Sequence, residues 1–316
     1  MPKRTKAIVA LILTTLIWGP APAIIKLGLA RIPPMTFLFV RLLLQSIIVL
    51  PFFLHHLIKY PLKLSQIPAL FTIGLFGQTF SLAMFFWAIS KTSSLDAAII
   101  GSVNPIFIML SAVIFLRETV TRREKIGALL ALIGTLIIVI QPWAESGFSL
   151  HNGFATRIAG NLLMLVYLIC NTFYTILTKK NFLKTKIDPF TKTCVAFFTA
   201  TVTLFPLSMI EIASLPISQL GVFGRLGILD LSLIFSLAYM ILLSGIAAYF
   251  LYEYALSKIE ASEVTVFTYS QILVAIPAGF LILGEKPSGV FLIGGMVIAG
   301  GIMMCYTPLR ETKHPS

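Results

Sequence analysis

Long apolar runs separated by short polar segments form the main pattern of this chain of 316 residues. Each run is about 20 residues long, the helix length needed to cross the ~30 Å hydrocarbon core of a bilayer. The pattern therefore predicts an all-α integral membrane protein with ten transmembrane helices. The ten predicted spans cover residues 7–29, 35–54, 68–89, 94–116, 126–142, 156–178, 190–210, 233–256, 262–283 and 288–306.

The second half of the chain repeats part of the first half. A shift of 167 residues without a gap places Glu118 on Glu285 and Gly134 on Gly301. In so apolar a chain, matching Glu and Gly positions in one register are harder to obtain by chance than Leu or Ile matches, so we infer an internal duplication. The predicted parts are a five-helix repeat at 1–145, a second five-helix repeat at 155–307 and a cytoplasmic tail at 308–316.

Composition and charge exclude a water-soluble protein and predict an orientation. The chain is 58% hydrophobic and 11% charged, whereas soluble domains carry about 25% charged residues. Its net charge is +12, and most Lys and Arg residues fall at span ends on the side of the N-terminus, where short loops remain in the cytoplasm. We expect a multi-pass protein of the cytoplasmic (inner) membrane with both termini in the cytoplasm. Five spans per half then make the two repeats inverted, an arrangement typical of secondary transporters.

Several other function classes lack their sequence features. No Lys/Arg-rich block with interleaved aromatics is present, so we expect no nucleic-acid partner. No GxxxxGK[ST] motif for ATP occurs. The three cysteines and four histidines lack the spacing of a metal site or a disulfide framework. We expect no cofactor, no metal and no catalytic residues.

Short motifs occur along the whole chain in a characteristic order. They are Trp18-Gly19, Lys26-Leu27-Gly28, Pro33-Pro34, Arg41, Asn104-Pro105, Leu116-Arg117-Glu118 and Gly127/Gly134, followed by Gly284-Glu285 and Gly294/Gly301. Together they resemble the EamA family of the drug/metabolite transporter superfamily. The resemblance implies a central cavity between two four-helix groups, with the fifth and tenth helices at the periphery. It leaves the substrate open, because the family exports amino acids, other metabolites and xenobiotics. The second half has no counterpart of Arg41.

Arg41 is the one charge that the pattern places well inside a span. An Arg that faces lipid costs several kcal/mol, so Arg41 is expected to point into the bundle or to extend toward the surface. Gln45 lies four residues further on the same helical face. Arg41 could bind a substrate carboxylate with two hydrogen bonds, or it could be a structural Arg bonded to backbone carbonyls.

The first predicted span contains two prolines, Pro20 and Pro22, close to Trp18. Proline removes helical hydrogen bonds, and broken membrane helices are tolerated where their backbone lines a cavity. Trp18 could therefore form part of a cavity wall, or the break could be only a packing kink. Lys26 is expected to extend to the outer headgroups.

Asn104 and Gln271 occupy the same position of the two repeats, in the middle of spans four and nine. A buried amide needs hydrogen-bond partners, which could be the substrate or a neighbouring helix. The other polar candidates for the cavity wall are Gln78, Ser102, Asn171, Tyr174 and Tyr269.

Three glutamates are candidates for coupling or gating. Glu118 and Glu285 each follow one span and open the next, where the helix dipole favours a carboxylate, so we expect structural capping or gating. Glu253 lies near the inner end of span eight among tyrosines. It could be a proton-coupling group whose pKa is raised by partial burial, or an ordinary interfacial Glu beside an aromatic belt, which is the commoner case.

The combined pattern predicts a secondary-active transporter that exports or exchanges small metabolites such as amino acids by alternating access. The alternatives are a multidrug exporter of lipophilic cations, a receptor or scaffold and, least favoured, an enzyme. The expected partners are a small-molecule substrate and membrane lipid. Small-residue pairs such as Gly127/Ala131 and Gly295/Ala299 favour packing within the chain over a homodimer, which stays possible.

Overall fold

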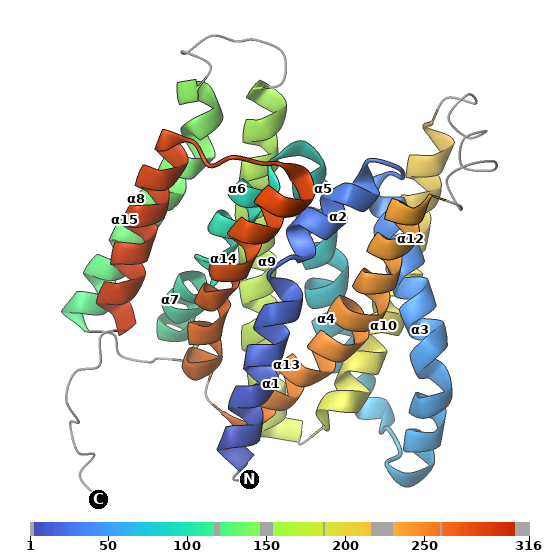
Figure 1. Cartoon of the computed structure of the whole chain (residues 1–316). Coiled ribbons are helices and arrows are strands. Elements are labelled where there is room, and N and C mark those ends of the chain that lie inside the picture. The colour runs from blue at the N-terminus through green and yellow to red at the C-terminus, as the bar shows by residue number, and fades with distance from the viewer. Residues whose placement is uncertain are drawn as a thin grey trace, which may run out of the picture.

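The computed structural model is a bundle of long helices, and its described residues contain no strand (Figure 1). Side chains are left out at a few helix ends and throughout 261–269. The described backbone covers residues 3–116, 121–145, 154–185, 187–215, 230–259 and 261–306.

The helices follow the predicted spans. The first half contains α1 (Lys3–Trp18), α2 (Ala21–Leu29), α3 (Pro34–Lys59), η1 (Leu64–Gln66), α4 (Ile67–Gly74), η2 (Leu75–Ser81), α5 (Leu82–Lys91), α6 (Ser94–Gly101), α7 (Asn104–Leu116) and α8 (Arg122–Glu145). The second half contains α9 (Phe154–Thr185), α10 (Pro189–Ala213), α12 (Leu231–Ala238), η4 (Tyr239–Ala247), α13 (Ala248–Lys258), α14 (Ala261–Leu283) and α15 (Gly289–Tyr306).

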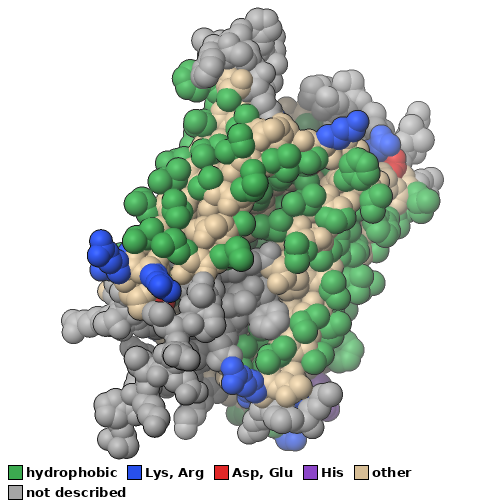
Figure 2. Space-filling model, turned by 60° about the vertical axis from the view of Figure 1, so that its left-hand side comes forward, with side chains coloured by type: hydrophobic (Ala, Val, Ile, Leu, Met, Phe, Trp, Pro, Cys, Tyr) green, Lys and Arg blue, Asp and Glu red, His purple; other side chains and the backbone are tan. Residues whose placement is uncertain are grey.

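A multi-pass helical membrane protein is confirmed. Among the described residues, eight helical segments are long and apolar enough to cross a membrane, and two shorter apolar helices cover Ser270–Leu283 and Gly289–Met304. Hydrophobic side chains form a broad surface on the face seen in Figure 2, with Lys and Arg toward its ends. Such a surface is stable where lipid rather than water covers it. The count of ten spans and the inverted repeat stay predictions.

Two predicted spans are broken and two contain a distorted turn. The first span divides into α1 and α2 at Gly19-Pro20, and the fourth divides into α6 and α7 at Ser102-Val103. Pro105 lies in the first turn of α7. Backbone N–H groups in a first turn have no helical acceptor, so the N–H that proline lacks costs no hydrogen bond. The third and eighth spans each contain a π-helical segment, η2 and η4. Shifted by 167 residues, η4 overlaps η2, so both halves carry the same distortion.

The helices α3 and α10 lie side by side and are joined by side-chain contacts at both ends. At one end, the Glu211 carboxylate of α10 accepts hydrogen bonds from the Thr36 N–H (2.7 Å) and the Thr36 hydroxyl (2.8 Å) in the first turn of α3. At the other end, Asp188 caps α10 by accepting from the Thr191 N–H (2.9 Å), and His56 near the end of α3 lies 3.2 Å from the same carboxylate. The two helices are therefore antiparallel and joined at both membrane faces.

The helices α8 and α15 pack along each other at the edge of the bundle (Figure 1). A Cβ added to Gly301 would lie 2.5 Å from the Gly127 carbonyl oxygen and 2.6 Å from the Ala131 nitrogen. Gly134 and Gly294 meet at the same interface. The small-residue pair Gly127/Ala131 thus serves packing within the chain, and a homodimer stays a prediction.

Gly301→Ala is expected to destabilise the protein, since the new methyl group would meet backbone atoms that cannot rotate away. Overpacking of this kind costs about 1–3 kcal/mol. The control is Gly300→Ala, because nothing lies within 4 Å of a Cβ there and Ala favours a helix over Gly by about 0.5–1 kcal/mol. Thermal unfolding in detergent should move downward for Gly301→Ala only. Equal shifts for both variants would contradict this account of the α8–α15 interface.

Candidate functional site

A central cavity lies between helices of the two halves, with about 950 Å³ of empty space when its open mouth is included. Its wall combines α1 to α3, η2 and α5 to α7 from the first half with α9, η4, α13 and α14 from the second half. Within the described part of the chain, α8 and α15 contribute no lining residue. This is the peripheral position that the family resemblance implies for the fifth and tenth spans.

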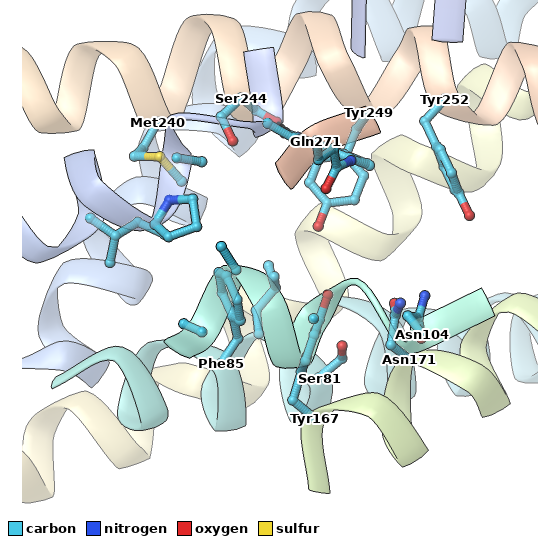
Figure 3. A pocket seen from close by; sticks show the side chains of 18 of the residues that line it. Ser81, Phe85, Asn104, Tyr167, Asn171, Met240, Ser244, Tyr249, Tyr252 and Gln271 are labelled. Atoms are coloured by element: carbon cyan, nitrogen blue, oxygen red, sulfur yellow. Dashed lines mark hydrogen bonds between the residues drawn. The ribbon is translucent and has the colours of Figure 1, made fainter. Parts of the chain in front are cut away.

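Figure 3 shows two facing walls with polar groups on each. Tyr249 and Gln271 extend from one wall, while Asn104 of α7 and Asn171 of α9 extend from the opposite wall. The predicted repeat pair Asn104 and Gln271 therefore faces the same space from opposite sides. The Asn104 Oδ1 atom is buried and accepts no hydrogen bond within the described structure.

The break in the first span places an aromatic cluster on the wall. Trp18 ends α1, and its ring centroid lies 5.0 Å from Tyr249 and 5.3 Å from Tyr252. The Trp18 Nε1–H donates a hydrogen bond (2.9 Å) to the Ser244 carbonyl. Ser244 belongs to the π-helical segment η4, so a carbonyl of the distorted turn holds the indole in place.

Arg41 lines the cavity although only 2% of its surface is exposed. Its Nε donates to the Gln45 Oε1 atom (2.9 Å), and its guanidinium carbon lies 5.7 Å from the centre of the Phe86 ring. Gly245 allows this arrangement, since a Cβ there would lie 2.3 Å from the Gln45 Nε2 atom. Among the described residues, no Asp or Glu forms an ion pair with Arg41.

The predicted site residues divide into three groups. Those that line the cavity are Trp18, Arg41, Asn104, Asn171, Tyr174 and Gln271. Three others are buried without lining it: Gln45 behind Arg41, Gln78, and Ser102, whose hydroxyl donates to the Ile99 carbonyl (2.6 Å) at the break between α6 and α7. The side chain of Tyr269 lies outside the described residues, and so does Glu118.

Several wall residues are not among those predicted from the sequence. They are Ser81, Phe85, Tyr167, Ser244, Tyr249 and Tyr252. Tyr249 and Tyr252 are three residues apart on one helix, so they share a face, and this spacing could have identified them. The remaining four resemble ordinary packing residues in an apolar run.

Glu253 is not an interfacial residue, and this interpretation of the sequence was wrong. The Glu253 residue is fully buried, its carboxylate forms an ion pair with Lys192, and it accepts a hydrogen bond from the Tyr174 hydroxyl. Lys192 is only 1% exposed in α10, although the sequence places it near the end of a predicted span. Arg41 is therefore one of several charges inside the bundle.

Glu285 caps a helix, but not the one expected. Its carboxylate accepts hydrogen bonds from the Ser94 N–H (3.0 Å) and the Leu95 N–H (3.1 Å), so it caps α6 instead of the following helix α15. Gly284 makes this possible, because its φ of +67° turns the chain back at the end of α14, a conformation that favours glycine.

Lys26 is one-third exposed near the end of α2 and also forms an ion pair that was not expected. Its ammonium lies 3.3 Å from the Glu285 carboxylate and donates to the Thr92 carbonyl (2.5 Å). Burial raises the pKa of Glu285. The hydrogen bonds from Ser94 and Leu95 and the charge of Lys26 together lower it by more than burial raises it, so the pKa of Glu285 falls below the ordinary value. The ends of α2, α6 and α14 are therefore joined by one carboxylate.

These observations define a multi-pass helical membrane protein with a polar-lined central cavity, the general form of a membrane transporter. The chain belongs to the EamA-like transporter family, whose sequence pattern matches residues 5–140 and again residues 158–307. The resemblance noted from the sequence is confirmed, and the family indicates a transporter rather than an enzyme.

Individual relatives are distant but extend over almost the whole chain. An uncharacterized transporter of Archaeoglobus fulgidus is 27% identical over 95% of this chain and 97% of its own length. A probable terminal-alkyne amino-acid exporter of Streptantibioticus cattleyicolor is 23% identical over 96% of this chain and 94% of its own length. A crystal structure with 15% sequence identity matches with a TM-score of 0.61 over 96% of this chain and 98% of the other chain, which shows a shared fold.

Glu285→Gln is expected to lower stability at neutral pH by about 0.5–2 kcal/mol, the range for loss of a helix cap. Because the folded pKa of Glu285 is lowered, its ionised form stabilises the fold above the ordinary carboxyl pKa. That contribution disappears as the pH falls through the lowered value. The difference in unfolding temperature between wild type and variant should therefore shrink on acidification. Lys286→Gln is the control for loop charge, and a difference that stays constant with pH would contradict the capping role.

Proposed function

We propose that the protein is a secondary-active transporter that exports or exchanges small metabolites, amino acids first among them, by alternating access of the central cavity. The observation that carries this proposal is Arg41, a buried cation on the cavity wall that forms no ion pair with a described acidic residue. A guanidinium can bind a carboxylate with two parallel hydrogen bonds. The low dielectric of the buried site strengthens such a contact.

The remaining cavity groups suit the rest of an amino acid. The amides of Asn104, Asn171 and Gln271 can exchange hydrogen bonds with polar substituents. The rings of Trp18 and Tyr249 can attract an ammonium group through their faces. The relative from Streptantibioticus cattleyicolor, named as a probable amino-acid exporter, supports the same substrate class.

The proposed architecture has ten spans in two inverted five-helix repeats, residues 1–145 and 155–307. Both termini would lie on the cytoplasmic side of the inner membrane. Support comes from the antiparallel pairing of α3 and α10, which are joined at both ends, and from the π-helical segments at equivalent positions of both halves. In Figure 1, α1 begins and α15 ends at the same end of the bundle. The proposed partners are the small-molecule substrate and membrane lipid.

A lipophilic-cation exporter is the second candidate, and the aromatic wall formed by Trp18, Tyr167, Tyr249 and Tyr252 favours it. Such substrates also require a negative group for strong binding. Among the described lining residues, none is Asp or Glu, whereas Arg41 is positive. The charge of the cavity therefore favours anionic or zwitterionic substrates.

Counterflow uptake into proteoliposomes tests the function and the role of Arg41 together. Vesicles loaded with unlabelled amino acids are expected to accumulate a labelled amino acid with the wild type. They should not do so with Arg41→Gln, because a neutral amide cannot replace the paired charge. Loss of a hydrogen-bonded charge pair costs about 2–5 kcal/mol of binding, more than a tenfold loss of affinity.

Arg31→Gln is the control for the loss of one positive charge. Arg31 is half exposed and pairs with Asp230 (2.9 Å) at the end of the bundle, so this variant should keep counterflow. Equal accumulation by wild type and Arg41→Gln would limit Arg41 to a structural role. Absence of accumulation for every amino acid, with uptake of cationic dyes, would favour the second candidate.

A further inference from the structure

A buried group of four polar side chains lies next to the cavity. Lys192 of α10 forms the ion pair with Glu253 of α13, and its ammonium also lies 3.3 Å from the Tyr174 hydroxyl and 3.3 Å from the Thr178 hydroxyl of α9. The Tyr174 hydroxyl donates to the second oxygen of Glu253. Each of these four residues is at most 5% exposed, so the group is separated from water.

Stability alone does not account for this arrangement. The cost of removing two charges from water is about as large as their attraction, and apolar residues of similar volume often stabilise a fold equally well. Ionisable residues inside membrane proteins are accordingly rare and frequently mark proton or ion pathways. The position of the Lys192–Glu253 ion pair in the bundle therefore has to explain why the pair is present.

Tyr174 joins the ion pair to the cavity. The side chain of Tyr174 lines the cavity, while its hydroxyl contacts both Lys192 and Glu253. A Cβ at Gly77 of η2 would lie 2.3 Å from this ring, so the π-helical segment passes directly over the tyrosine. The hydroxyl is thus held between the buried charges and the space that a substrate would occupy.

The direction of the hydrogen bond between Tyr174 and Glu253 depends on whether the Glu253 carboxylate carries a proton. An ionised carboxylate only accepts hydrogen bonds, so the Tyr174 hydroxyl must donate to it. A protonated Glu253 would instead donate, and Tyr174 could accept from it and turn its own hydrogen toward the cavity. Protonation would also change the charge of the Lys192–Glu253 pair from zero to +1, with formation of one O–H bond and no other bond change.

We propose that Glu253 holds a coupling proton, that Lys192 is its counter-charge, and that the Tyr174 hydroxyl links its protonation to substrate binding in the cavity. This inference rests on the transport function proposed above. The charged or titratable contacts of Glu253 are Lys192 from α10 and Tyr174 from α9, with Tyr249 and Tyr252 nearby on its own helix. The described parts of α1, η4 and α14 add no ion pair or hydrogen bond to it.

Two transport assays on Glu253→Gln separate coupling from transport. Counterflow needs only binding and alternation, so Glu253→Gln is expected to retain it. Accumulation driven by an imposed pH gradient needs the titratable carboxylate, so this variant is expected to lose it. Tyr174→Phe, which keeps the ring and removes the hydroxyl, should weaken the gradient response in the same assay.

Two further variants control for folding and for loss of a buried charge. If Glu253→Gln does not fold, the double variant Lys192→Met/Glu253→Leu replaces the pair by apolar residues and should show counterflow without coupling. Asp96→Asn breaks a different ion pair, the one between Asp96 and Arg157 (2.8 Å). The Asp96 carboxylate is also fully buried. This variant should keep the gradient response of the wild type.

A measurement that needs no substrate completes the test. Infrared difference spectra of the purified protein should show a protonated-carboxyl band that appears on acidification and that Glu253→Gln removes. A missing band, or a gradient response that Glu253→Gln leaves intact, would overturn the proposed coupling. Absence of counterflow in the wild type would instead contradict the transport function itself.

Discussion

The hydrocarbon core of a membrane contains no water, so each backbone N–H and C=O group must find its partner inside the protein. This constraint explains where the helices of this chain are irregular. The break between α1 and α2, the break between α6 and α7 and both π-helical segments adjoin the central cavity. The helices at the periphery, α8 and α15, are continuous over their described lengths. Irregular backbone is therefore concentrated at the one place where polar groups can be used by a ligand or by neighbouring side chains.

The same constraint distinguishes the two kinds of buried charge. Glu253 and Lys192 neutralise each other, Glu253 accepts a hydrogen bond from the Tyr174 hydroxyl and Lys192 donates one to the Thr178 hydroxyl, so their charges are balanced without a ligand. Arg41 has Gln45, the face of Phe86 and Tyr249 near it, and no described acidic residue forms an ion pair with it. A cation without a counter-charge is costly to hold away from water, and a bound carboxylate would remove that cost. Arg41 is therefore suited to a ligand, and the ion pair is suited to a proton.

Much of the architecture could be predicted from the sequence, because the length of an apolar run and the position of prolines act locally. The break at Gly19-Pro20 and the placement of Asn104 and Gln271 near the centre of the bundle are examples. Tertiary partners could not be predicted. Lys192 lies one turn from a helix start, where a charged side chain could reach the surface, and the packing of α10 against α9 and α13 buries it. Glu285 was assigned to its sequence neighbour α15, whereas the turn at Gly284 directs it to α6, nearly 200 residues away.

The capping carboxylates also constrain which parts of the bundle can move separately. The α3–α10 pair is joined at both ends, so separation of these helices would uncap the first turn of α3 at Glu211 and would break the His56–Asp188 contact at the start of α10. The ends of α2, α6 and α14 depend instead on the single carboxylate of Glu285, which is partly exposed and is supported by Lys26. Separation of α14 from α6 would release one carboxylate and two backbone N–H groups to water, which can solvate all of them. The α3–α10 pair is thus held at two ends and the α6–α14 contact at one, so α3 and α10 are the more suitable fixed element in the transport cycle proposed above.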